Sequence, residues 1–123
     1  MTKICRSSDC GNSPKNQLVQ EFTIAMARCD TERVREIVTD DVHWVAIGRK
    51  PVHGVDAFCE ALARYGPASQ LTIEHVLSHG RTGAVNGVVS FGEKSRAFCH
   101  MYIFGNVKGA NIKSLSTYTI PLK

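Results

Sequence analysis

Apolar residues recur at helical spacing in the first half of the chain and alternate with polar residues in the second. Ser13 and Pro14 open a first helix, because serine caps free backbone N–H groups and proline suits the first helical turn. One apolar stripe marks this helix: Leu18, Phe22, Ala25, Met26 and Cys29. Residues 1–12 are polar and without a period, so we expect them to form a flexible leader.

Two further helices and one strand are predicted before the alternating half. Asp30-Thr31 can cap a short second helix, and a strand over residues 42–47 follows it. The third helix runs from about Val55 to Tyr65. Gly66-Pro67 ends it, since glycine supplies a C-cap and proline cannot continue a helix.

Beyond Pro67 the apolar period becomes two, which predicts strands. Four segments show it, namely residues 71–77, 84–91, 96–104 and 112–120. Their connectors are short and contain glycine or other turn formers, as in antiparallel hairpins. Helices followed by an antiparallel meander predict one α+β domain over residues 13–123.

Composition and charge narrow the function classes. With 43% hydrophobic and 21% charged residues, the chain is an ordinary globular protein. The net charge is +4, but the basic residues are scattered without interleaved aromatic residues, so no nucleic-acid partner is expected. No secretory signal and no run of 18 apolar residues is present, so no membrane association is expected. Five cysteines, an odd number, favour the reducing cytoplasm.

Four stretches, in this order, carry a family resemblance: residues 30–32 with 39–44, Gly48 with 51–54, residues 98–104, and residues 112–115 with Tyr118. Over residues 13–120 they resemble the nuclear-transport-factor-2-like superfamily, in particular its SnoaL-like branch. The resemblance implies a cone-shaped fold, with three N-terminal helices on a strongly curved, mainly antiparallel sheet that encloses a pocket. It also implies a homodimer through the outer sheet face. The function that we expect from the sequence implies no cofactor.

Strand alternation predicts which side chains face that pocket. His100 shares a face with Phe98 and Tyr102, and His75 shares one with Leu71 and Ile73, although a bulge would reverse it. His100 is the first catalytic candidate, because imidazole titrates near neutrality, and His75 is the second. In cyclase-like relatives an Asp often stands where this chain has His100. The expected substrate-binding residues are Phe22, Met26, Trp44, Phe58, Tyr65, Tyr102, Ser116 and Tyr118.

Several chemistries are disfavoured. Only Glu74 and Glu93 supply carboxylates after residue 66, which argues against a two-carboxylate glycosidase mechanism. Residues 86–89 read Asn-Gly-Val-Val and lack the Arg-x-Asp of the related epoxide hydrolases. No two histidines stand four apart within a predicted helix, and His75 and His79, which are four apart, fall in a strand and its turn, so no metal site is expected.

The sequence therefore predicts a SnoaL-like pocket protein for a small apolar or aromatic molecule. As an enzyme it would be a cofactor-independent isomerase, cyclase or dehydratase, in which His100 transfers a proton and Tyr102 and Tyr118 orient the ligand. The alternative is a non-catalytic ligand-binding or dimerisation module, in which His100 is a buried histidine satisfied by one partner. A protein–protein adaptor is a third reading.

Overall fold

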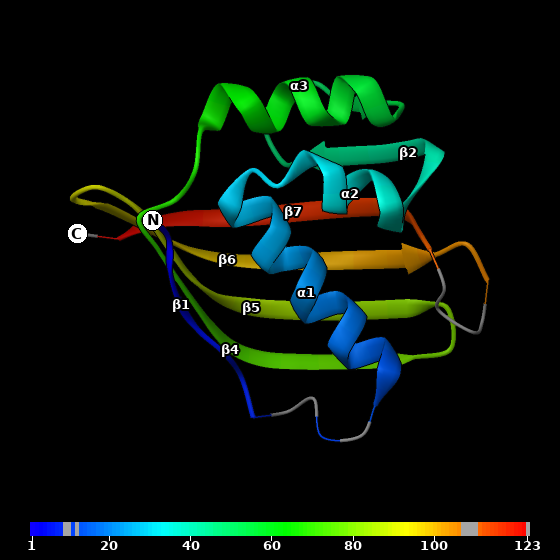
Figure 1. Cartoon of the computed structure of the whole chain (residues 1–123), viewed down its shortest axis with the longest axis horizontal. Helices are drawn as coiled ribbons and strands as arrows, with labels where there is room; N and C mark the ends of the chain where they lie inside the picture. The colour runs from blue at the N-terminus through cyan, green and yellow to red at the C-terminus, as the bar shows by residue number, and fades with distance from the viewer. Residues whose placement is uncertain (9–10, 12, 107–110, 123) are drawn as a thin grey trace.

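The computed structural model describes residues 1–8, 11, 13–106 and 111–122. Within these residues, three helices pack on a seven-stranded sheet (Figure 1). The helices are α1 (Pro14–Arg28), α2 (Thr31–Ile37) and α3 (Val55–Tyr65). The predicted α+β class and the three helices ahead of the meander are confirmed.

The sheet is mixed and does not close. Its strands are β1 (Lys3–Cys5), β2 (Val38–Ala46), β3 (Val52–His53), β4 (Gln70–His79), β5 (Thr82–Phe91), β6 (Lys94–Phe104) and β7 (Ile112–Leu122). They are hydrogen-bonded in the order β1-β4-β5-β6-β7-β2-β3. The β1–β4 and β2–β7 pairs are parallel and the others antiparallel, so the sheet is mainly antiparallel as expected. The strong curvature remains a prediction.

Local signals set the helix boundaries. The Ser13 side chain accepts a hydrogen bond from the Asn16 N–H at 3.2 Å, and Asp30 accepts one from the Arg33 N–H at 3.2 Å. These bonds satisfy N–H groups that have no partner inside their helices. Gly66 ends α3 at a φ of 74°, a conformation that glycine adopts without steric cost.

The first residues contain a strand that the sequence pattern does not predict. Lys3–Cys5 form β1, which pairs in parallel with the start of β4. The Thr2 hydroxyl also donates to the Ala68 carbonyl oxygen at 2.6 Å. A three-residue strand with Ile4 as its one large apolar side chain has no recognisable alternation, which is why the pattern missed it.

Two bulges reverse the alternation of side chains within strands. In β4, Ile73 pairs with Gly87 and His75 with Asn86, so Glu74 is an extra residue. In β7, Ser114 pairs with Ile103 but Ile112 pairs with Phe104, so an extra residue separates the two pairs there as well. Each extra residue turns the rest of its strand over, as one inserted residue must in a structure of period two.

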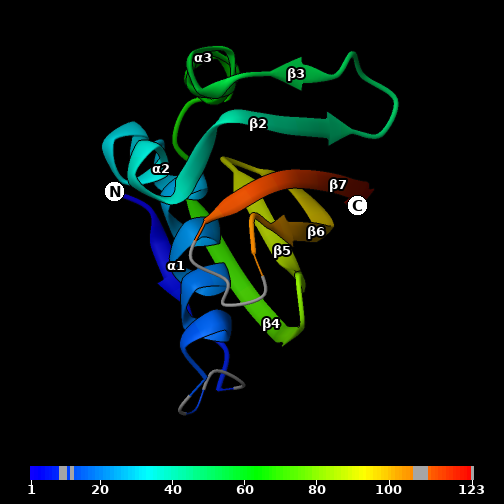
Figure 2. The same ribbon diagram turned by 90° about the vertical axis from the view of Figure 1, so that its right-hand side faces the viewer.

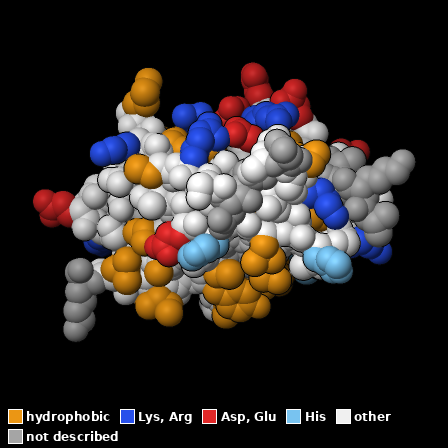
Figure 3. All heavy atoms as spheres, turned by 90° about the horizontal axis from the view of Figure 1, so that it is seen from below, with side chains coloured by type: hydrophobic (Ala, Val, Ile, Leu, Met, Phe, Trp, Pro, Cys, Tyr) orange, Lys and Arg blue, Asp and Glu red, His pale blue; other side chains and the backbone are white. Residues whose placement is uncertain are grey.

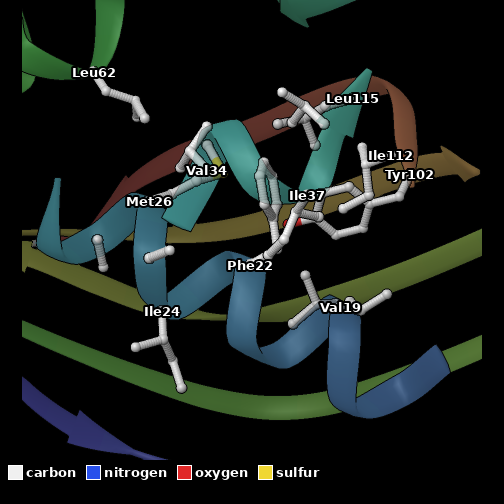
Figure 4. Packing of buried hydrophobic residues seen from close by; sticks show 14 of the residues in the cluster. Val19, Phe22, Ile24, Met26, Val34, Ile37, Leu62, Tyr102, Ile112 and Leu115 are labelled. Atoms are coloured by element: carbon white, nitrogen blue, oxygen red, sulfur yellow. The ribbon is translucent and has the colours of Figure 1, made fainter. Parts of the chain in front are cut away.

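The core lies between the helices and one face of the sheet. Figure 2 shows α1 against this face and α3 beside β2 and β3. In Figure 4, Phe22 points from α1 toward Tyr102, and the two rings pack edge to face with centroids 5.6 Å apart. Trp44 and Phe58 pack at 4.6 Å and join α3 to β2. This packing fixes the walls of the cavity described next.

Candidate functional site

A cavity of about 320 Å³ lies at one end of the sheet. Its walls come from the last turns of α1 and α3, the end of β2 and the turn after it, and parts of β4 to β7. Most of the lining is apolar or aromatic, with Trp44, Leu71 and Phe98 among the large side chains. A hollow of this size and character falls at the lower end of the range for small-molecule sites.

Three side chains form a hydrogen-bonded chain in the cavity wall. The Trp44 Nε1–H donates to the Thr117 Oγ1 at 2.9 Å, and the same Oγ1 lies 2.8 Å from the Nδ1 of His100. All three residues are buried and line the cavity. They come from β2, β7 and β6, so the central strands of the sheet hold them.

These hydrogen bonds favour one tautomer of His100. The Thr117 oxygen accepts the Trp44 N–H, and within the described residues the Nδ1 of His100 is the one acceptor recorded for the hydroxyl proton of Thr117. We therefore assign the ring proton to Nε2. Every fully buried side-chain nitrogen and oxygen in the described residues has a hydrogen-bond partner. The Nε2 of His100 has no partner among the described residues, since the hydrogen bond of this ring is at Nδ1. Nε2 is consequently not fully buried, and because His100 lines the cavity we infer that Nε2 faces it.

Burial also fixes the charge of His100. Removal from water penalises the imidazolium and lowers the pKa of His100 from 6.5 to about 4. The ring is therefore neutral at pH 7. A neutral imidazole with its proton on Nε2 is a hydrogen-bond donor toward the cavity and a weak base.

Comparison with known proteins agrees with this architecture. The family model for the SnoaL-like domain matches residues 19–113. The chain belongs to the SnoaL-like domain family. No curated protein sequence matches it significantly.

Solved structures share the fold of this SnoaL-like domain at low sequence identity. A nuclear-transport-factor-2-like protein of unknown function from Burkholderia xenovorans LB400 is 12% identical, with a TM-score of 0.78 over 89% of this chain and 84% of its own. A proposed ketosteroid isomerase from Kribbella flavida DSM 17836 is 14% identical, with a TM-score of 0.75 over 89% and 79%. A proposed SnoaL-like polyketide cyclase from Jannaschia sp. CCS1 is 12% identical, with a TM-score of 0.72 over 88% and 89%.

Four of the residues predicted for the site of this SnoaL-like domain line the cavity: Met26, Trp44, Tyr65 and His100. Phe22, Phe58 and Tyr102 lie behind it in the core, with no exposed surface. The Tyr102 hydroxyl is 2.9 Å from the Thr23 Oγ1, and burial raises the pKa of Tyr102. Thr23 in turn donates to the Val19 carbonyl oxygen, so Tyr102 is the donor to Thr23.

The predicted facing of three site residues is wrong. His75, Ser116 and Tyr118 are absent from the cavity lining, and His75 and Tyr118 lie together on the opposite face of the sheet. The bulge at Glu74 turns His75 outward, where its Nδ1 is 3.2 Å from the Asn86 Oδ1. The bulge near the start of β7 directs Thr117, not Ser116, toward the core.

Sequence reasoning missed Thr117 and two arginines of the cavity, Arg49 and Arg96. The signal for Thr117 was present, because Ile112 and Leu115 are three apart and cannot share one face of a regular strand. The arginines had no signal, since Arg49 lies in a turn and Arg96 near a strand end.

Two absences concern the part of the chain that the structure describes. No three His, Cys, Asp or Glu side chains gather there in a way that could hold a metal ion. No helix there is both long and apolar enough to cross a membrane.

Proposed function

We propose that this SnoaL-like domain binds a small, mostly apolar or aromatic molecule in the cavity, and that His100 holds an oxygen atom of that molecule. The observation that supports this proposal is the buried, neutral imidazole of His100, which is bonded at Nδ1 to Thr117 and lines the cavity. The Nε2–H inferred above is the group that would donate to the ligand. An N–H donor that lies in an apolar wall and has no protein partner contributes binding free energy when the ligand supplies a hydrogen-bond acceptor.

The remaining walls suit an aromatic or alicyclic body. The Trp44 ring lies 6.3 Å from the Tyr65 ring, and both line the cavity together with Phe98. Aromatic walls recognise flat apolar molecules through burial and ring contacts. One hydrogen bond and apolar volume are sufficient for a binding protein.

A cofactor-independent isomerase, cyclase or dehydratase is the second candidate. A neutral Nε2–H can polarise a carbonyl group and stabilise an enolate as it forms. Two relatives in fold carry isomerase and cyclase descriptions. Binding ranks first because a histidine with a pKa of about 4 is a weak base at pH 7. No carboxylate of the described residues lines the cavity to serve as a base instead.

A matched pair of neutral ligands tests the binding function. We expect 2-acetylnaphthalene, which has a carbonyl acceptor, to bind about tenfold more tightly than 2-ethylnaphthalene, which has none. Trp44 is the single tryptophan of the chain and lines the cavity, so the NMR shift of its indole N–H reports occupancy.

Three variants assign the effect to His100. His100→Gln retains a donor, so we expect it to bind the ketone within about threefold of the wild type, whereas His100→Phe loses the preference for the ketone. His75→Gln on the outer face is the matched control and should bind like the wild type. If neither naphthalene shifts the Trp44 resonance, the binding proposal is wrong.

The enzyme candidate has its own readout. Enolisation of 2-acetylnaphthalene in D₂O exchanges its methyl protons for deuterium, which NMR follows directly. If the wild type accelerates this exchange and His100→Gln does not, the enzyme reading replaces the binding reading. Equal rates with and without protein leave binding as the function.

We also propose a homodimer and a cytoplasmic location. The outer sheet face carries exposed apolar side chains, including Leu77 at 59% and Ile120 at 68% exposure. Figure 3 shows hydrophobic side chains gathered along one side of the molecule beside histidines. Such an apolar face favours a partner, and the two-fold contact of a second copy is the commonest. The free thiols Cys5, Cys29, Cys59 and Cys99 support a reducing compartment.

A further inference from the structure

Two arginines from different elements lie at the mouth of the cavity. Arg49, in the turn after β2, has its guanidinium carbon 5.4 Å from the centre of the Tyr65 ring. Arg96, in β6, donates from its Nη1 to the Thr119 Oγ1 at 3.1 Å. Both side chains line the cavity and remain exposed. Tyr65 and Thr119 orient the two guanidinium groups without neutralising them, since neither partner carries a formal charge.

No acidic side chain of the described residues balances this pair. Other arginines do have carboxylate partners, namely Arg6 with Glu21, Arg33 with Glu36 and Arg35 with Asp56. Neither Arg49 nor Arg96 forms such a salt bridge within the described residues, and no Asp or Glu there lines the cavity.

Further positive charge lies next to this mouth. Lys50 and Arg64 line an adjoining hollow together with Arg49 and Tyr65. Charges of one sign around an opening with apolar walls concentrate their field there and attract a counter-ion. The group that would complete this end of the molecule is therefore an anion.

The chemistry of the two arginines indicates which class of anion would bind. A guanidinium group presents paired N–H donors that match the two oxygens of a carboxylate. The buried part of the cavity wall is apolar and includes Trp44 and Phe98. On the basis of the ligand-binding function proposed above, we propose that the natural ligand is an aromatic or apolar carboxylate. Its body lies inside the cavity, and its carboxylate group lies between Arg49 and Arg96.

Two ligands of equal shape test this assignment: 2-naphthoate, which is anionic, and 2-naphthamide, which is neutral. Titrations of the full chain, followed by the Trp44 indole resonance, should give about tenfold tighter binding of the naphthoate. The preference should shrink as NaCl is added, because salt screens exposed charges.

The arginines are then changed one at a time. Arg49→Gln and Arg96→Gln should each reduce the preference for 2-naphthoate over 2-naphthamide about threefold, so that the two losses together remove the tenfold preference. The double variant should bind both ligands equally. Arg81→Gln, in the exposed turn between β4 and β5 and outside the cavity lining, carries the same charge change and should bind like the wild type. Circular dichroism confirms that each variant is folded.

The outcomes separate the two proposals. If both ligands bind with equal affinity, or if the naphthoate preference survives in the double arginine variant, the cavity binds ligands but the carboxylate assignment is wrong. If neither ligand shifts the Trp44 resonance, the ligand-binding function is itself wrong, and the carboxylate assignment with it.

Discussion

At the scale of single residues, Thr117 joins the two polar groups of the cavity wall. Its hydroxyl accepts from Trp44 and lies 2.8 Å from the Nδ1 of His100. Thr117→Val keeps the shape of the side chain and leaves the buried indole N–H and the His100 Nδ1 without this partner. We expect a loss of about 1–3 kcal/mol in the free energy of unfolding, measured by urea denaturation.

Ser116→Ala is the matched control for that variant, because Ser116 is the preceding residue and does not line the cavity. We expect it to change the free energy of unfolding by less than about 0.5 kcal/mol. Equal effects of the two substitutions would contradict the role given to Thr117.

The burial of His100 predicts a dependence of stability on pH. Its pKa is about 4 in the folded protein against 6.5 as the ordinary value. Between these two values the unfolded chain binds a proton that the folded protein does not, so acid favours unfolding. The contribution of His100 is complete above pH 6.5 and declines as the pH falls toward 4.

The measurement is the free energy of unfolding at pH 7 and pH 5. We expect His100 to account for a loss of about 2 kcal/mol between these values in the wild type. His100→Gln, which does not titrate, should lose correspondingly less, and His75→Gln should behave like the wild type. If His100→Gln loses as much stability as the wild type, the neutral buried imidazole is wrong.

At the scale of elements, the sequence predicted the helices well and the facing of two strands poorly. Capping residues such as Ser13 and Asp30 act within one turn, so their effect is readable from the sequence. A bulge depends on the register against a neighbouring strand, which a single strand does not contain. Regular alternation therefore predicts His75 and Tyr118 in the pocket, whereas both lie on the opposite face of the sheet.

Two features of the sequence nevertheless indicate the bulge in β4. Ile73 and Val76 are both buried although they are three apart, a spacing that a regular strand places on opposite faces. The second feature is Gly87, which lies opposite the bulge in β4. A methyl group there would lie 1.9 Å from the Thr72 carbonyl oxygen, so only glycine permits the close approach.

Gly87→Ala tests this reading of the bulge. Because the clash is with backbone rather than with a flexible side chain, we expect a loss of more than about 3 kcal/mol or failure to fold, measured by urea denaturation. Gly105→Ala is the control, since the added methyl group would make only an ordinary contact with Thr39 at 3.7 Å. Similar stabilities of the two variants would exclude the bulged register of β4.

At the scale of the whole molecule, the two faces of the sheet have different partners. The helices cover one face and leave the cavity at its end, whereas the other face exposes Leu77, Tyr118 and Ile120. In the proposed homodimer these side chains are buried against a second copy. The double variant Leu77→Glu with Ile120→Glu places like charges in that contact and should raise the dimer dissociation constant on the order of 100-fold.

Sedimentation of the wild type and the double variant measures this effect. Gln17→Glu adds a charge to the exposed side of α1 and should leave the dimer intact. A monomeric wild type would contradict the dimer, and an unchanged dimer in the double variant would exclude this face as the contact.

The central claim is that the cavity binds a small molecule through His100, and a crystal structure with 2-acetylnaphthalene tests it most directly. We predict the naphthalene ring against Trp44 and the ketone oxygen roughly 3 Å from the Nε2 of His100. An empty cavity, or a ligand only on the outer sheet face beside His75 and Tyr118, would contradict the account.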